Sequence, residues 1–166
     1  MKLPLAKLTL GLLGSLLCVL SSDGATTKEL MATVARIDRA RILKLANAAL
    51  ALKPPAVTDH VATNSTGGPH DFFSQADYAW PNPANENGLP YIGRDGESNP
   101  DVFSFHRMAM RDMKDAVAAL AAAYALTADD KYASKAADFV RVFFLDEKTR
   151  MNPNLDQAQV VLGDGK

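Results

Sequence analysis

Apolar residues recur every three to five positions between residues 27 and 52, which is the spacing of one face of an α-helix. Thr26 or Thr27 can cap the start of this segment, and the pair Pro54 and Pro55 can end it. The pattern therefore predicts one helix across residues 27–52. Its apolar face consists of Leu30, Val34, Ile37, Ile42, Leu45, Ala49 and Leu52.

Helical spacing returns near Phe103 and continues to residue 144, with a break at residues 127–130 (TADD) that supplies a new N-terminal cap. Two amphipathic helices with so short a connection must lie antiparallel, as an αα-hairpin. Each still carries an apolar stripe, so further helices are needed to cover it. The stripe positions are Met110, Met113, Val117, Leu120 and Tyr124 in the first helix and Tyr132, Ala136, Phe139, Val140, Phe143 and Phe144 in the second.

Periodicity is lost between residues 56 and 100, where Pro, Gly, Asn and Asp are frequent and aromatic residues are interspersed. Loops of this length in a compact domain are functional or disordered, and the aromatic content argues against disorder. The tail, residues 146–166, is polar and supplies no element that closes the fold. We therefore expect an all-α fold class with a long ordered loop and a thin core, as in a fragment of a larger domain.

The first 25 residues have the order of a secretory signal peptide, with Lys2 and Lys7 before an apolar run and a small-residue exit that ends at Ala25. The apolar run is about 13 residues long, whereas a bilayer span needs about 20. A buried N-terminal helix or a retained anchor is the alternative interpretation. We expect a cleaved signal peptide at residues 1–25, one domain over residues 26–166, a periplasmic or secreted location and no stable membrane insertion after cleavage.

Composition and motifs exclude several classes of function. The net charge is −1, so the chain lacks the basic excess that nucleic-acid partners require. The only cysteine, Cys18, lies in the signal segment, and the bulky Leu17 before it argues against a lipoprotein. The sequence has no phosphate-binding glycine loop, zinc-helix motif or nucleophile elbow, and the isolated His60, His70 and His106 lack metal-site spacing. We expect no metal and no cofactor.

Aromatic, amide and guanidinium side chains gather in residues 77–96 and 152–159, and this mixture suits a sugar polymer. Aromatic faces stack on sugar rings, amides bind hydroxyls, and a guanidinium binds the carboxylate of a uronate. In the alternative interpretation, the aromatic rings are plugs that hold the long loop to the helices, as we expect of Phe72 and Phe73. The candidate substrate-binding residues are Tyr78, Trp80, Asn82, Tyr91, Arg94, Asn152, Asn154 and Gln159.

Several motifs in a fixed order give the chain a family resemblance. They are GPHDFFS at 68–74, DYAWPNP at 77–83, GLPYI at 88–92 followed by RDG at 94–96, and FLD at 144–146 followed by TRMNPN at 149–154. Together with the helical hairpin, they resemble the N-terminal region of alginate lyase-like proteins, from about residue 27 to the end.

The resemblance implies an α/α toroid, a partly closed ring of helical hairpins around a groove for an acidic polysaccharide such as alginate or another uronan. It also implies cleavage by β-elimination, in which an Asn, Gln or Arg neutralises the uronate carboxylate and a Tyr or His serves as base and acid. In lyases of this type those groups lie in later hairpins, so no catalytic role is transferred to any residue here. A non-catalytic remnant that binds the polysaccharide, and a helical interaction module with a structural loop, remain the alternatives.

Overall fold

The computed structural model describes residues 26–164, so the predicted signal peptide lies outside the described residues. The described residues divide into two units, the first ending at Ile37 and the second beginning at Asp38. Helix α2, Thr27–Ile37, belongs to the first unit and begins with a capping box. The Glu29 amide donates to Thr26 Oγ1 at 3.3 Å, and the Thr26 amide donates to Glu29 Oε2 at 2.7 Å. Among the described residues, no helix has the length and apolar character needed to cross a membrane.

The prediction of one helix across residues 27–52 is wrong, because the helix is broken at Asp38. Asp38 has φ −118° and ψ 2°, and α3, Arg39–Leu50, begins after it. The Asp38 carbonyl accepts from the Ile42 amide at 3.0 Å, and its carboxylate accepts from Arg41 Nε at 2.7 Å. Asp38 thus starts a new helix, as acidic residues favour.

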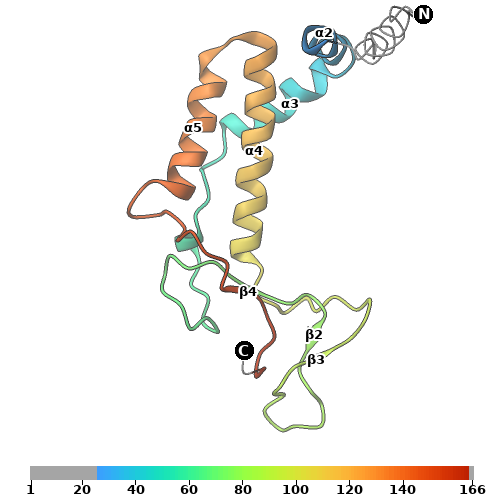
Figure 1. Cartoon of the computed structure of the whole chain (residues 1–166), viewed down its shortest axis with the longest axis vertical. Coiled ribbons are helices and arrows are strands. Elements are labelled where there is room, and N and C mark those ends of the chain that lie inside the picture. Colours follow the sequence, from blue (N-terminus) through green and yellow to red (C-terminus); the bar gives the residue numbers. More distant parts are fainter. Residues whose placement is uncertain (1–25, 165–166) are drawn as a thin grey trace, which may run out of the picture. The chain divides into compact units, whose positions relative to one another are not determined.

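The helical hairpin predicted from the sequence is confirmed. Helix α4, Phe105–Thr127, and helix α5, Asp130–Phe144, lie side by side with α3 against α4 (Figure 1). Ala128 ends α4 in the left-handed conformation (φ 53°). Asp129 caps α5, accepting from the Lys131 amide at 3.1 Å.

The core lies between these three helices. Leu120 of α4 and Phe139 and Phe143 of α5 are fully buried, and α3 adds its small-residue face. The faces of α3 and α4 in the core are rich in alanine, and the largest fully buried side chains between the helices are the α5 rings of Phe139 and Phe143. Around them lie the buried residues Ile42, Ala46, Ala49, Ala109, Met113, Ala116 and Ala123.

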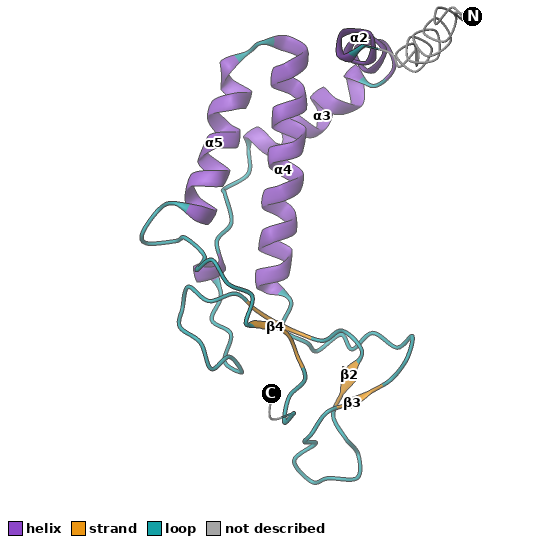
Figure 2. Cartoon of the chain, viewed as in Figure 1, coloured by secondary structure: helices purple, strands orange, loops and turns teal. Residues whose placement is uncertain are grey.

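The predicted fold class, an all-α domain that forms part of an α/α toroid, is wrong: within residues 26–164 helices and strands are mixed. Strand β1, Phe73–Gln75, pairs in parallel with β4, Gln157–Val160. Strand β2, Ala79–Trp80, pairs antiparallel with β3, Ile92–Gly93. A short 3-10 helix, Val57–Asp59, precedes them. The β1–β4 pair lies near the start of α4, and the β2–β3 pair lies farther from that helix (Figure 2).

The strands escaped prediction because none is long enough to show an alternating pattern. All three residues of β1 are buried, including the polar Ser74 and Gln75, so no polar face marks the strand. Strand β4 lies in the tail, where no element was expected. Its register shifts by one residue against β1, and Gln159 takes φ 58° at that irregularity. Backbone hydrogen-bonding groups of the long loop are therefore paired with groups of a segment distant in sequence.

Candidate functional site

The β2–β3 hairpin brings three of the predicted binding residues together. Ala79 pairs with Gly93 and Trp80 with Ile92, and the Arg94 amide donates to the Tyr78 carbonyl at 2.9 Å. Tyr78 lies in the turn directly before β2, where the Ala79 amide donates to the Ala76 carbonyl at 3.1 Å, and Trp80 lies in β2 itself. Tyr78 and Arg94 flank the open end of the hairpin, and together with Trp80 they are called here the hairpin wall.

Trp80 is held on its edge and covered on one face. Its indole Nε1 donates to the Glu97 carbonyl at 2.8 Å. The Arg94 guanidinium lies over the ring with Cζ 4.8 Å from the ring centroid, an arrangement favoured by the ring quadrupole. Arg94 Nη1 is also 3.6 Å from a carboxylate oxygen of Glu97. Glu97 therefore touches both members of the pair, through its backbone and its side chain.

The aromatic residues of the loop divide into two groups. Phe72 and Phe73 are buried, as expected of plugs. Tyr78 is 51% exposed, so its ring does not fill the space between loop and helices. Trp80 is intermediate, with one edge anchored. The hairpin wall thus offers one free ring, one partly covered ring and a cation, which suits a polymer of sugar rings with carboxylates.

Asn82 lies in the turn that joins β2 to β3, and its side chain is used there. Its Oδ1 accepts from the Ala84 amide at 3.0 Å, and its own amide donates to the Gly88 carbonyl at 2.8 Å. This is the local bonding by which asparagine stabilises turns. These bonds give Asn82 a structural role in the turn. Neither of them directs its side chain toward the hairpin wall.

Tyr91 and Gln159 are connected through the C-terminal tail. The Tyr91 amide donates to the Leu162 carbonyl at 2.8 Å, and the Gln159 amide donates to Ser74 Oγ at 3.0 Å. The tail thus runs from β1 to the end of the hairpin loop. Gln159 is exposed and Tyr91 is partly buried.

Asn152 and Asn154 lie in a third place, where they fasten two loops. Asn152 Nδ2 donates to Asp71 Oδ1 at 2.8 Å, and the Asn152 amide donates to the His70 carbonyl at 2.9 Å. Hydrogen bonds from Asn152, from the Gly68 amide and, to a smaller degree, from Asn154 hold the pKa of Asp71 below its ordinary range. His70 Nδ1 donates to the Arg150 carbonyl at 2.7 Å.

Two of the histidines have fixed structural bonds. His106 is buried, its Nδ1 accepts from the Phe73 amide at 3.0 Å, and its Nε2 lies 2.8 Å from the His60 carbonyl. This pattern requires the neutral tautomer with the proton on Nε2, so both ring nitrogens are occupied. His60 stacks on Phe105, with ring centroids 4.1 Å apart. Over residues 26–164, no group of His, Cys, Asp and Glu is arranged to hold a metal ion.

Several residues of the site were missed from the sequence. Glu97 orients Trp80, Asp77 binds Arg107 Nη1 at 2.5 Å, and the buried Asn99 bonds to the backbone of β2. The RDGESNP run at residues 94–100 reads as turn chemistry, and no sequence signal separates a turn asparagine from a buried one.

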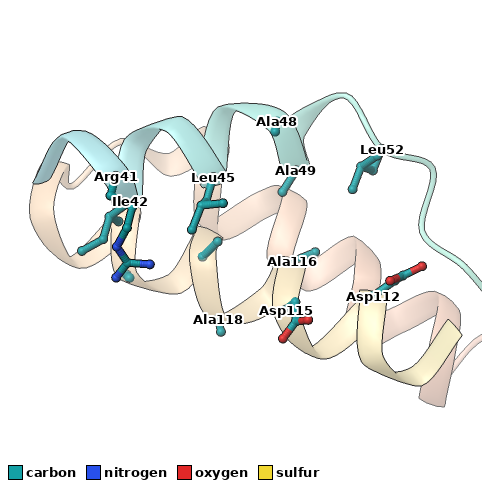
Figure 3. A pocket seen from close by; sticks show the side chains of 12 residues that line it. Arg41, Ile42, Leu45, Ala48, Ala49, Leu52, Asp112, Asp115, Ala116 and Ala118 are labelled. Carbon is teal, nitrogen blue, oxygen red and sulfur yellow. The ribbon is translucent and has the colours of Figure 1, made fainter. Parts of the chain in front are cut away.

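A separate hollow lies between α3 and α4. It has a volume of about 640 Å³ and shares no residue with the hairpin wall. Ile42 and Leu45 of α3, and Leu52 just after this helix, face alanines of α4 across it, with Arg41, Asp112 and Asp115 at its rim (Figure 3). An alanine-lined apolar groove has few groups that could orient a sugar, so the hairpin wall is the better candidate site.

Comparison with known proteins agrees with the resemblance predicted from the sequence. A family model described as alginate lyase matches residues 56–166. The crystal structure of an alginate lyase from Bacteroides ovatus at 1.60 Å resolution is 39% identical in sequence and similar in fold, with a TM-score of 0.74. That match covers 84% of this chain and 39% of the other, so this chain spans less than half the length of its structural relative. A search of curated proteins gave no match.

Proposed function

The chain belongs to the alginate lyase family, and from this premise we propose that it is part of a polysaccharide lyase that cleaves a uronate-containing polymer, such as alginate or glucuronan, by β-elimination. We propose further that the hairpin wall binds the polymer. The observation that carries this proposal is the arrangement of Arg94 over Trp80, in a hairpin whose preceding turn exposes Tyr78.

The chemistry of the hairpin wall matches what a uronan presents. Each sugar ring has an apolar face of C–H groups, and an exposed ring such as Tyr78 can stack on it. Each uronate also carries a carboxylate, and a guanidinium fork can donate two parallel hydrogen bonds to it. The Arg94 guanidinium is oriented by Trp80 before any ligand arrives, so less side-chain entropy is lost on binding.

Binding without turnover is the second candidate function, and one observation favours it. β-Elimination requires a base for the proton at C5 and an acid for the leaving oxygen at C4. The buried His106 has both ring nitrogens engaged with backbone groups. His106 is therefore not available as base or acid, and a chain in which no other Tyr or His reaches the sugar would hold the polymer and leave it uncut.

Export to the periplasm or the exterior completes the proposal. Its support is the order of residues 1–25, with a positive start, a short apolar run and a small-residue exit. A cell-envelope or extracellular location would bring the protein to polymers too large to enter a cell.

The test is to incubate the purified chain with alginate and, separately, with glucuronan and to follow the ultraviolet absorbance of the unsaturated uronate that elimination creates. Binding is followed in parallel by the fluorescence of Trp80, which is the only tryptophan of the chain. A rise in absorbance supports the lyase. A fluorescence response without an absorbance rise supports the binding function, and neither signal in a folded sample rejects both.

A matched pair of variants assigns binding to the hairpin wall. Tyr78 and Tyr124 are both exposed, at 51% and 42%, but Tyr124 lies near the far end of α4. Tyr78→Ala is expected to weaken uronan binding about tenfold, the loss of a stacking contact of about 1.4 kcal/mol, and Tyr124→Ala to leave it unchanged. Equal effects of the two substitutions would contradict the proposed wall.

A further inference from the structure

Asn99 is a polar residue buried in a loop whose neighbours are exposed. Its relative exposure is 5%, while Ser98 and Pro100 on either side are open to solvent. Burying an amide side chain is unfavourable unless its donor and acceptor groups are bonded. The partners of Asn99 therefore indicate what this burial accomplishes.

Asn99 is hydrogen-bonded to backbone carbonyls on both sides of Tyr78. The Asn99 amide donates to the Asp77 carbonyl at 2.7 Å, and Asn99 Nδ2 donates to the Ala79 carbonyl at 2.7 Å. The Oδ1 atom accepts from the Asp101 amide at 3.0 Å. Asn99 thus bonds the backbone on both sides of the most exposed ring of the wall, before it through its own backbone amide and after it through its side chain.

The same segment also reaches Trp80, since the Glu97 carbonyl accepts from its indole. Residues 97–99 therefore form hydrogen bonds to both residues of β2 from outside the β2–β3 pair. The β2–β3 pair has only two residues on each strand, and two-stranded pairs of this size are marginal by themselves. The orientation of the wall must accordingly come from groups outside the hairpin.

We infer that Asn99 is a positioning residue that sets the orientation of Tyr78 and Trp80 for uronan binding. This inference rests on the proposed binding function of the hairpin wall. Asn99 is not part of the apolar core between α3, α4 and α5, so its contribution is local to the wall. It contacts the polymer through neither donor, because both are bonded to backbone carbonyls.

Two substitutions separate the bonds. Asn99→Asp keeps an acceptor for the Asp101 amide and loses the donor to the Ala79 carbonyl, and Asn99→Ala loses both side-chain bonds without adding a charge. Asn87→Asp is the control, because it adds the same charge to the exposed loop and keeps the acceptor that Asn87 Oδ1 offers to the Leu89 amide. The readouts are Trp80 emission, its quenching by acrylamide, affinity for alginate, and helical circular dichroism.

Both Asn99 variants are expected to make Trp80 more accessible to acrylamide and to weaken alginate binding about tenfold, while the helical signal is retained. Asn87→Asp should match the original chain in all readouts. The inference is overturned if Asn99→Ala leaves Trp80 quenching and affinity unchanged, or if it melts the helices, which would make Asn99 a general stabilising residue.

The two proposals fail in different ways. If the original chain binds neither alginate nor glucuronan, the proposed function is rejected, and the positioning claim is decided by Trp80 quenching alone. If the original chain binds and Asn99→Ala binds equally well, the function stands and the role of Asn99 is rejected.

Discussion

The guanidinium of Arg94 lies 4.8 Å from the centroid of the Trp80 ring and is at the same time 3.6 Å from the Glu97 carboxylate. An arginine between a ring and a carboxylate is oriented, but part of its charge is compensated within the protein. The ion pair is exposed and stabilises the fold by at most about 1 kcal/mol. A uronate carboxylate could therefore replace Glu97 at little cost to the fold.

Arg94→Lys should weaken uronan binding about fivefold, although the positive charge is retained. Lysine lacks the planar fork that binds a carboxylate through two hydrogen bonds and stacks on indole. The affinity for alginate is measured by titration of Trp80 fluorescence, and Trp80 emission without polymer should also shift. Arg111→Lys, on the exposed surface of α4, is the control and should change neither. Unchanged affinity in Arg94→Lys would mean that Arg94 only covers the indole.

Glu97→Gln should strengthen uronan binding, by up to about fivefold for an exposed ion pair. The substitution removes the carboxylate that competes for Arg94, while the bond from Trp80 Nε1 is kept because its acceptor is the backbone carbonyl. The same fluorescence titration at low ionic strength checks it, and added salt should reduce the difference between the variants. A weaker affinity would show that Glu97 orients Arg94 more than it competes with the polymer.

The helices could be predicted from the sequence because each presents several turns of apolar spacing. The α4–α5 hairpin, the cap at Asp129 and the capping box at Thr26 and Glu29 all follow from local patterns. The break at Asp38 could not be predicted, because the apolar spacing continues across it. Helix boundaries of this kind depend on a single backbone conformation, which the apolar pattern does not reveal.

The site was predictable in residue type and less so in arrangement. Arg94 does lie over Trp80 and bonds to the backbone of Tyr78, because the β2–β3 hairpin joins residues that are about 15 positions apart. Asn82, Asn152 and Asn154 were proposed for their amide groups, but the structure uses these groups to hold turns and loops. Amides that bind ligands and amides that bind backbone have the same sequence signature. Their roles in binding remain predictions.

Gly163→Ala should loosen the tail that reaches Tyr91. Gly163 has φ 80°, and a Cβ there would lie 2.8 Å from Pro90 Cα, closer than atoms approach. Gly96→Ala is the matched control, since Gly96 has φ 75° and its Cβ would meet nothing within 4 Å. Both substitutions place a side chain at positive φ, which lowers the free energy of unfolding by about 1 kcal/mol. Gly163→Ala should lower it by about 1–3 kcal/mol more through the clash. Equilibrium unfolding in urea measures both, and equal losses would show that the tail adjusts freely.

The acid sensitivity of the loops should depend on Asn152 and Asp71. The pKa of Asp71 is held below its ordinary range, chiefly by the hydrogen bond from Asn152 and then by that from the Gly68 amide. A depressed folded-state pKa stabilises the fold above the unfolded pKa, and this stabilisation is lost as the pH falls through the folded pKa. Asn152→Ala removes the largest cause, so the pKa of Asp71 should rise toward its ordinary value, which makes this stabilisation smaller and completes its loss at a higher pH.

Titration of the Asp71 carboxyl carbon by nuclear magnetic resonance measures this pKa directly, and urea unfolding at several acidic pH values measures its consequence. Asn154→Ala is the graded control: its bond to Asp71 is a smaller cause, so the pKa of Asp71 should rise by less. A larger rise in Asn154→Ala than in Asn152→Ala would reverse the order of the two bonds. No rise in either would mean that water replaces both amides at the carboxylate, and the two loops would then be joined by the backbone bond from Asn152 to His70 and by the bond from His70 Nδ1 to the Arg150 carbonyl.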